Sequence, residues 1–437
     1  FSTSRTILHR DVHGVYVPGT EASSEEMKSL AFAIDKAGEG TLEIVSDWLD
    51  KEIEMSWMRE YVEKSDCGLT VLQTSGDAIK TILFCEEQFL KGKNVRPQFP
   101  GRNVGMMFGL ESSLHPFIGH PSYREIADLP LSERVKIMKD PAFKEKLLNE
   151  KPNFASEIEK SMNEQDSAKS QEEIKEAANL GLKLISNYDT QFILGDPPNY
   201  EPGKEDSIAA LAKSKNIPEL EVIYDEFLKN EGTNLVYACF TPYENHKLDF
   251  VERAYGLKSS VAGGSDGGAH CGLICDASMP TTNLSHWARD REAGKKIPIE
   301  LIVRKQTKDT AETYGLFDRG EIKTGMLADL NIIDFEKLNV THPKMVYDLP
   351  LGGRRLIQTS SGYLATIKSG EVVYEAGEAT GVLPGKLIRG KQTCEVKTEK
   401  ERVPFIDRTF RLMSVKALKL LWNYRKSPFK TTVVSDD

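Results

Sequence analysis

The chain of 437 residues is long enough for one large α/β domain, or for two or three smaller domains that each have a core. Its composition, 39% hydrophobic and 28% charged residues, is that of an ordinary globular protein, and no stretch approaches the ~20 apolar residues that would span a bilayer. The net charge of −9 argues against a general nucleic-acid-binding surface.

Cysteine usage and the first residues bear on the cellular compartment. Cys271 and Cys275 are close in sequence but lack the C-x-x-C spacing of zinc or redox motifs. Scattered cysteines are typical of reduced thiols, and FSTSRTILHR lacks the layout of a secretory signal. We therefore expect a cytoplasmic protein with a small-molecule substrate, without nucleic-acid or membrane partners, and we leave a homo-oligomer open.

Short apolar runs alternate with helical patterns along the first part of the chain. The runs predict strands at 42–45, 69–72, 104–110, 234–240 and 261–264, and helices are expected over 23–38, 57–65 and 77–92. Ser23 is a plausible N-cap of the first helix. Strands that alternate with helices indicate parallel β/α units rather than a sandwich.

A polar helical region over 129–185, broken by Pro141 and Pro152, predicts an insertion in one loop. It is either a solvated insertion or a mobile lid over the active site. From 321 to 395 the pattern turns to glycine-punctuated β-structure, which predicts a small appended β domain. A tail over 396–437 follows, with a basic amphipathic helix that suits packing, oligomer formation or contact with an anionic membrane.

The strongest local signal is VAGGSDGGAHCG at 261–272. An apolar strand ends there in Ser265 and Asp266, and a carboxylate at the carboxyl end of a barrel strand points into the barrel mouth. The glycines that follow allow a tight turn or a close approach of backbone to ligand. His270 is near enough in sequence to share the site. The alternative is that Asp266 only caps a turn.

Three ordered segments resemble the amidohydrolase superfamily, in particular its D-aminoacylase (N-acyl-D-amino-acid deacylase) branch. They are the strand-ending SDGG, then TKDTAETYG at 307–315, then DRGEIKTGMLADLNIID at 318–334. Upstream, FSTSRTILHRD with VPGT over 1–20 resembles the fourth strand of D-aminoacylase-like members. The resemblance implies an α/β fold, a (β/α)8 TIM-type barrel over 1–320, with the small β domain appended.

By the same resemblance, residues 1–5 are the fourth barrel strand, and 42–46, 69–73, 104–110 and 261–265 are the fifth to eighth. The first three strands, with their metal-binding His-x-His pair, are then expected to be absent from this chain. The family also places a metal-binding His after the fifth and sixth strands, where this sequence has LEIVSDW and LTVLQTSG. The resemblance implies zinc or another divalent metal with Asp266 as a ligand, and the missing histidines make a changed or absent metal the alternative.

Polar residues in the loops after apolar strands are candidates for the rest of the site, because loops at the carboxyl face of a barrel carry binding residues. Asp266 and His270 are the candidate catalytic residues. The candidate substrate-binding residues are Arg5, His9, Arg10, Arg102, His115, Tyr243 and His286. Arg5, Arg10 and Arg102 suit bidentate binding of a substrate carboxylate.

The resemblance implies hydrolysis of a non-peptide C–N (amide) bond in an N-acyl amino acid or a related small molecule. Asp266 would act there as base or metal ligand. Two alternatives remain open at this stage. One is a catalytically altered barrel protein that binds a ligand or partner, and the other is a metal-free lyase or isomerase with Asp266 and His270 as an acid/base pair.

Overall fold

The computed structural model describes residues 1–7, 9, 15–48, 50–73, 79–154, 182–183, 185–268 and 270–393. They form two compact units, one of residues 1–302 with 340–359 and one of 303–339 with the residues after 359. The chain therefore passes between the units three times, whereas the sequence suggested one boundary near residue 320. None of the described helices is both long and apolar enough to cross a membrane.

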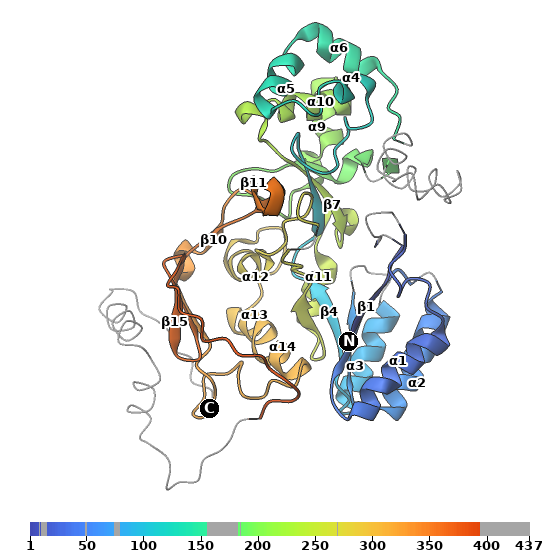
Figure 1. The fold of residues 1–437 in the computed structure, drawn as a ribbon, viewed down its shortest axis with the longest axis vertical. Coiled ribbons are helices and arrows are strands. Elements are labelled where there is room, and N and C mark those ends of the chain that lie inside the picture. Colours follow the sequence, from blue (N-terminus) through green and yellow to red (C-terminus); the bar gives the residue numbers. More distant parts are fainter. Residues whose placement is uncertain are drawn as a thin grey trace. The chain divides into compact units, whose positions relative to one another are not determined.

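The centre of the first unit is a parallel sheet of five strands in the order β1-β2-β3-β4-β8 (Figure 1). The strands are β1 Ser2–Arg5, β2 Thr41–Ser46, β3 Gly68–Leu72, β4 Val95–Pro100 and β8 Val261–Gly263. Helices α1 Ser24–Ala37, α2 Lys51–Lys64 and α3 Ile79–Leu90 connect the first four strands. This arrangement confirms the expected α/β fold class, with five parallel strands in one sheet among the described residues.

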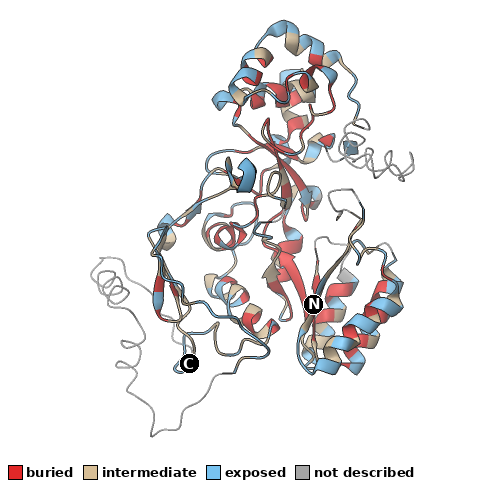
Figure 2. Cartoon of the chain, viewed as in Figure 1, coloured by how far each residue is buried: buried red, intermediate tan, exposed pale blue. Residues whose placement is uncertain are grey.

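Alternating burial explains why these segments form a sheet covered by helices. Leu42 and Ile44 on β2, with Val71 on β3, pack into one core with residues of α1 and α2, such as Met27 (Figure 2). Ser23 caps α1, because its side-chain oxygen accepts the backbone N–H of Glu26 at 3.2 Å, as the sequence predicted.

Polar side chains of neighbouring strands bond to one another. The Gln98 Nε2 donates to the Thr70 Oγ1 at 2.7 Å and to the Glu43 Oε1 at 3.0 Å, so β2, β3 and β4 are tied together by side chains as well as by backbone. A Cβ on Gly263 would lie 2.5 Å from the Gln98 Oε1, so a larger residue there would require the Gln98 side chain to shift.

The prediction that residues 104–110 form the seventh barrel strand is wrong. The strand that lies between β3 and β8 in the parallel sheet is β4 at Val95–Pro100. The apolar run forms β5 Val104–Phe108, which pairs antiparallel with β7 Val236–Thr241. β6 Gln191–Ile193 completes this three-stranded sheet. The sequence of β4, VRPQFP, does not predict a strand, because two prolines and two long polar side chains interrupt its apolar pattern. All six residues are nevertheless buried.

The sequence predicted a helical insertion over 129–185. The insertion between β4 and β8 is longer than that range, because it contains the β5-β7-β6 sheet as well as helices. Its helices are α4 Pro121–Arg124, α5 Leu131–Met138, α6 Pro141–Asn149, α9 Ile208–Lys215, α10 Glu219–Phe227 and α11 Asp249–Tyr255. The first five of these helices pack around an aromatic core that includes Phe108, Phe117 and Phe227, whereas α11 packs into the core that contains Phe99 of β4. α5 and α6 confirm the helical character of the predicted region, and residues 155–181 lie outside the described residues.

Short helices and a hairpin complete the first unit. After β8 come α12 Met279–Thr282, the π-helix η7 Asn283–Asp290 and α13 Ile299–Gln306, and the antiparallel pair β11 Lys344–Leu349 and β12 Gly353–Ile357 belongs to this unit. Single turns of 3-10 helix in this unit are η3 Tyr188–Thr190, η4 Lys204–Asp206, η5 Asn230–Gly232, η6 Glu244–His246 and η9 Pro350–Gly352, and η8 Phe335–Lys337 belongs to the second unit.

The second unit is mainly β, as expected for the glycine-punctuated stretch. After α14 Lys308–Thr313, a four-stranded antiparallel sheet has the order β16-β15-β14-β9, and two short strands that lie between β9 and β14 in the chain pair with each other. The strands are β9 Leu330–Ile333, β10 Asn339–Val340, β13 Ser360–Ser361, β14 Tyr363–Lys368, β15 Glu371–Glu375 and β16 Glu378–Ala379. The predicted basic helix of the 396–437 tail lies outside the described residues.

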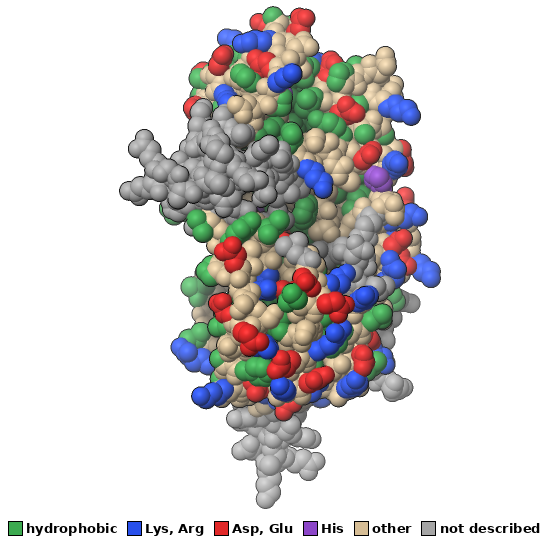
Figure 3. All heavy atoms as spheres, turned by 90° about the vertical axis from the view of Figure 1, so that its right-hand side faces the viewer, with side chains coloured by type: hydrophobic (Ala, Val, Ile, Leu, Met, Phe, Trp, Pro, Cys, Tyr) green, Lys and Arg blue, Asp and Glu red, His purple; other side chains and the backbone are tan. Residues whose placement is uncertain are grey.

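Acidic and basic side chains are interspersed on the face of the first unit that carries α1 and α2 (Figure 3). Lys28 bonds Glu25 within α1 and Glu60 on α2, and Lys64 bonds Glu60. Exposed ion pairs of this kind contribute ~0–1 kcal/mol each to the free energy of unfolding. The main effect of these charged side chains is therefore to keep the outer faces of the two helices hydrated.

Candidate active site

The candidate site lies at the carboxyl ends of the parallel strands, which meet at one edge of the sheet. Asp47 follows β2, Gln73 follows β3, and Asp266 comes three residues after the end of β8. Asp266 is exposed and lies neither in a helix nor at the amino ends of the strands. The prediction that it lies at the carboxyl end of a strand is therefore confirmed.

Two histidines lie together beside this carboxylate. The ring centroids of His9 and His270 are 5.8 Å apart, so the segment after β1 meets the loop after β8. Burial and the neighbouring His270 lower the pKa of His9, while Asp266 and Asp47 oppose this change. The backbone N–H of Ile7 donates to the Asp47 Oδ2 at 2.8 Å, which holds the ends of β1 and β2 together. Two imidazoles and two carboxylates thus share this edge.

The backbone around Asp266 adopts left-handed conformations. Asp266 and His270 have φ of 41° and 48°, and Gly264 and Gly268 beside them have φ of 73° and 101°. Aspartate and histidine tolerate positive φ better than most residues, but at a cost of ~1–3 kcal/mol that the surrounding structure must offset. Such residues cluster at functional sites, which favours a functional role over a simple turn.

Gln73 offers an amide with no partner at the end of β3. Its Nε2 and Oε1 are both buried without a hydrogen-bond partner in the described part of the chain, and the residue is 1% exposed. Buried polar atoms are nearly always bonded to protein, water or ligand, so a polar group is expected against this amide.

The residues described here do not fit the histidine-rich metal site that the resemblance implies. Asp47 and Gln73 follow the strands where that site needs imidazoles. Within the described ranges, no three His, Cys, Asp or Glu side chains are placed to hold one metal ion. Zinc requires three or four such ligands, and the described residues at this edge do not supply them.

Two of the three arginines expected to bind a substrate carboxylate have internal partners. The Arg5 Nε donates to the Glu54 Oε1 at 2.7 Å, and both side chains are largely buried. Arg102 is fully buried, where it pairs with the Asp276 Oδ1 at 3.1 Å and lies 3.6 Å above the Tyr200 ring. Arg10 lies outside the described residues.

His115 and Tyr243 also lie in the interior. The His115 Nδ1 accepts the backbone N–H of Phe117 at 3.2 Å, and burial, with Arg134 and other positive groups nearby, lowers its pKa to about 3. The Tyr243 hydroxyl donates to the carbonyl of Pro202, and burial raises its pKa. Both side chains have structural partners where they lie.

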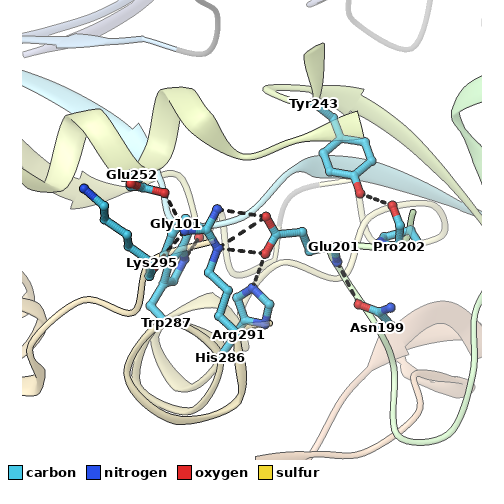
Figure 4. A network of polar contacts seen from close by, with 10 residues as sticks. All are labelled: Gly101, Asn199, Glu201, Pro202, Tyr243, Glu252, His286, Trp287, Arg291 and Lys295. Atoms are coloured by element: carbon cyan, nitrogen blue, oxygen red, sulfur yellow. Dashed lines mark hydrogen bonds and ion pairs between the residues drawn. The ribbon is translucent and has the colours of Figure 1, made fainter. Parts of the chain in front are cut away.

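His286 belongs to a network of charged residues (Figure 4). Its Nε2 lies 2.7 Å from the Glu201 Oε2, which also accepts the Arg291 Nε at 3.0 Å. Arg291 in turn donates to the Glu252 Oε2 at 2.7 Å. Burial is the largest single effect and raises the pKa of Glu201, but the hydrogen bonds and charges of His286 and Arg291 together lower it. The neighbouring Trp287 fixes η7 to the end of β4, because its Nε1 donates to the Gly101 carbonyl at 2.5 Å.

Asp47, Gln73 and Glu201 were not among the predicted site residues. Asp47 stands directly after a strand, in the position that singled out Asp266, so the same rule applied to β2 would have found it. Glu201 lies in the polar loop LGDPPNYEP, but its partner His286 is 85 positions away, and no local signal connects the two.

Comparison with known proteins addresses the resemblance. The amidohydrolase family matches residues 252–374, which include β8, Asp266 and His270. Among solved structures, the chain is similar to a D-aminoacylase whose structure "defines a novel subset of amidohydrolases", with 15% sequence identity and a TM-score of 0.41. That match covers 84% of this chain and 59% of the D-aminoacylase chain, so this chain spans less than two thirds of its length.

No curated protein matches the chain. The family match contains all three segments over 261–334 on which the resemblance rested. Residues 252–374 are therefore similar to the amidohydrolase family, as the sequence indicated.

Proposed function

We propose that the protein hydrolyses an amide C–N bond of an N-acyl amino acid or a related small molecule, at the carboxyl edge of the β1-β2-β3-β4-β8 sheet. The observation that carries this proposal is the position of Asp266, exposed just after β8 with His9 and His270 beside it. The match of residues 252–374 to the amidohydrolase family supports the reaction class.

The chemistry needs one base and a route for one proton. Asp266 takes a proton from water as the water oxygen attacks the amide carbonyl, and the new C–O bond gives a tetrahedral intermediate. The C–N bond then breaks while the proton passes from Asp266 to the leaving nitrogen. In this proposal His270 would share the proton. The products are a free amine and a carboxylic acid, which releases its remaining proton to water at neutral pH.

Polar groups at the same edge would orient the substrate. The unpartnered amide of Gln73 can donate to a carbonyl oxygen and accept from an amide N–H, which are the two groups of the scissile bond. Because Arg5 and Arg102 have internal partners, Arg10 is the remaining candidate for the substrate carboxylate, and a metal ion stays a prediction from the family.

The test is Asp266→Asn, which keeps the shape of the side chain but removes its basicity. Turnover of a panel of N-acyl-D- and N-acyl-L-amino acids should fall by a factor of about 100 or more if Asp266 is the base. The melting temperature should stay unchanged, because the side chain is exposed. Asp128→Asn, at an exposed position in the insertion, is the matched control. Full turnover in the Asp266 variant would end the proposal.

Binding without hydrolysis is the second candidate, favoured by Asp47 and Gln73 in the positions of the family's metal-binding histidines. In that case the wild-type protein binds the N-acyl amino acids in calorimetry but releases no free amine from any of them. Assaying the protein before and after added divalent metal separates this outcome from an enzyme that had lost its ion.

A further inference from the structure

A cavity lined by charged, polar and apolar residues lies in the first unit. Three chain segments enclose about 240 Å³: residues 109–112 after β5, 232–235 before β7, and 342–345 at the start of β11. Pockets for drug-sized ligands measure roughly 300–1,000 Å³, so this cavity suits a smaller molecule. Asp266 and His270 are not among the residues that line it.

Charges of both signs line this cavity. Glu111 and Lys344 are both lining residues, and the Tyr347 hydroxyl holds the Glu111 carboxylate through a hydrogen bond of 2.7 Å to its Oε1. Burial, with Glu111 beside it, raises the pKa of Tyr347, so the phenol stays protonated and remains a donor. Lys344 is exposed and has no carboxylate partner among the described residues. Its ammonium group is therefore available to a ligand.

A buried hydroxyl without a partner points to a ligand as well. Ser112 lines the cavity and is 4% exposed, yet its Oγ has no hydrogen-bond partner within the described residues. A hydroxyl can both donate and accept, and a buried one is nearly always bonded. A polar molecule in the cavity would satisfy it.

We infer that this cavity binds a free amino acid as a zwitterion, with its ammonium group at Glu111, its carboxylate at Lys344 and the Ser112 hydroxyl bonded to one of them. Charge-assisted hydrogen bonds of this kind are about twice as strong as neutral ones. An N-acyl amino acid lacks the ammonium group and would leave Glu111 without a partner, so the cavity discriminates a free amino acid from its acylated form.

The cavity is joined to the loop that carries Asp266. Ser113, next to Ser112, donates its backbone N–H to the Gly272 carbonyl at 2.9 Å, two residues beyond His270. A bound amino acid would therefore order residues 109–113 and, through this bond, the loop after β8. This goes beyond the proposed hydrolysis, and a binding measurement tests it without any turnover.

The experiment is isothermal titration calorimetry of the whole chain with D- and L-alanine and with D- and L-leucine. N-acetylalanine, propionate and ethylamine are the comparison ligands, since each lacks one or both charges of the zwitterion. We expect saturable binding of a free amino acid and binding at least tenfold weaker for each comparison ligand. No saturable binding of any amino acid up to about 10 mM, roughly ten times a millimolar Kd, would overturn the inference.

Two variants locate the binding in this cavity. Lys344→Ala and Glu111→Gln should each weaken binding by about tenfold or more, the loss expected for one charge-assisted contact. The amide oxygen introduced by Glu111→Gln can still accept from Tyr347, so the cavity wall is kept. Lys139→Ala and Glu145→Gln, at exposed positions in the insertion, are the matched controls. Binding that is unchanged in the two cavity variants would overturn the assignment, whatever the result for Asp266→Asn.

Discussion

Arg102 is a buried arginine whose role is set by its partner Asp276. The pair lies in the interior, and burial raises the pKa of Asp276 to about 6, although Arg102 acts in the opposite direction. Arg102→Met removes the counter-charge and should lower the free energy of unfolding by ~3–5 kcal/mol, as for other broken buried pairs.

The pH dependence of that loss tests the cause. A carboxyl whose pKa is raised in the folded state contributes most to folding stability below its unfolded pKa. This contribution to stability is lost as pH rises through the folded pKa. The loss in Arg102→Met should therefore be larger at about pH 8 than at about pH 5, where Asp276 takes up a proton. Urea denaturation at the two pH values measures it, and adding Asp276→Asn should recover part of the loss at about pH 8. Equal losses at both values would contradict the account.

Arg102 also shows what sequence alone could and could not predict about the site. Asp266 was found because its signal is local, an apolar strand followed by a carboxylate and two glycines. Arg102 looked equally accessible after a strand, but its partner Asp276 is 174 positions away and its burial depends on packing that no local pattern reports. The pairing of Glu201 with His286 has the same long-range character.

The elements were predicted well where apolar periodicity is regular and poorly where it is not. β2, β3 and β8, with α1 to α3, lie near their expected positions because each carries apolar residues that pack into a core. β1, with the sequence STSR, has no such residues and was expected from the family resemblance alone. β4 was missed because Pro97 and Pro100 interrupt its pattern, while the more apolar run at 104–108 joined an antiparallel sheet instead. Periodicity indicates that a segment is a strand but does not say which sheet it joins.

The central position of β4 can be tested at Phe99. This side chain is 1% exposed and packs edge-on against Tyr255, with ring centroids 4.8 Å apart. Phe99→Ala should lower the free energy of unfolding by ~3–5 kcal/mol, the usual cost of emptying an aromatic core position. Leu90→Ala at the end of α3, where the side chain is 63% exposed, is the control and should change little. A loss of unfolding free energy below about 1 kcal/mol is roughly what a surface substitution causes. Such a small loss in Phe99→Ala, measured by urea denaturation, would be incompatible with a buried strand.

At the scale of the whole molecule, the two units have cores of very different size. The described residues of the first unit form three large apolar clusters, whereas those of the second unit form one cluster of Ala365, Ile367 and Val372 with two partly buried neighbours. Hydrophobic burial scales with the apolar area removed from water, so the second unit should be the less stable of the two. Two thermal transitions are expected, with the second unit melting first.

A matched pair of isoleucine substitutions assigns these transitions. Ile367 in the second unit is 2% exposed and Ile44 in the first is 1% exposed, so each change to Ala should cost its own unit ~2–5 kcal/mol. In differential scanning calorimetry, Ile367→Ala should lower the first transition by several degrees, at ~2–8 °C per kcal/mol for units of this size, and leave the second in place. Ile44→Ala should do the reverse, because its contacts lie in the core between β2 and α1. If a single transition shifts equally in both variants, the units unfold together, and the three passages of the chain between them are enough to couple their folding.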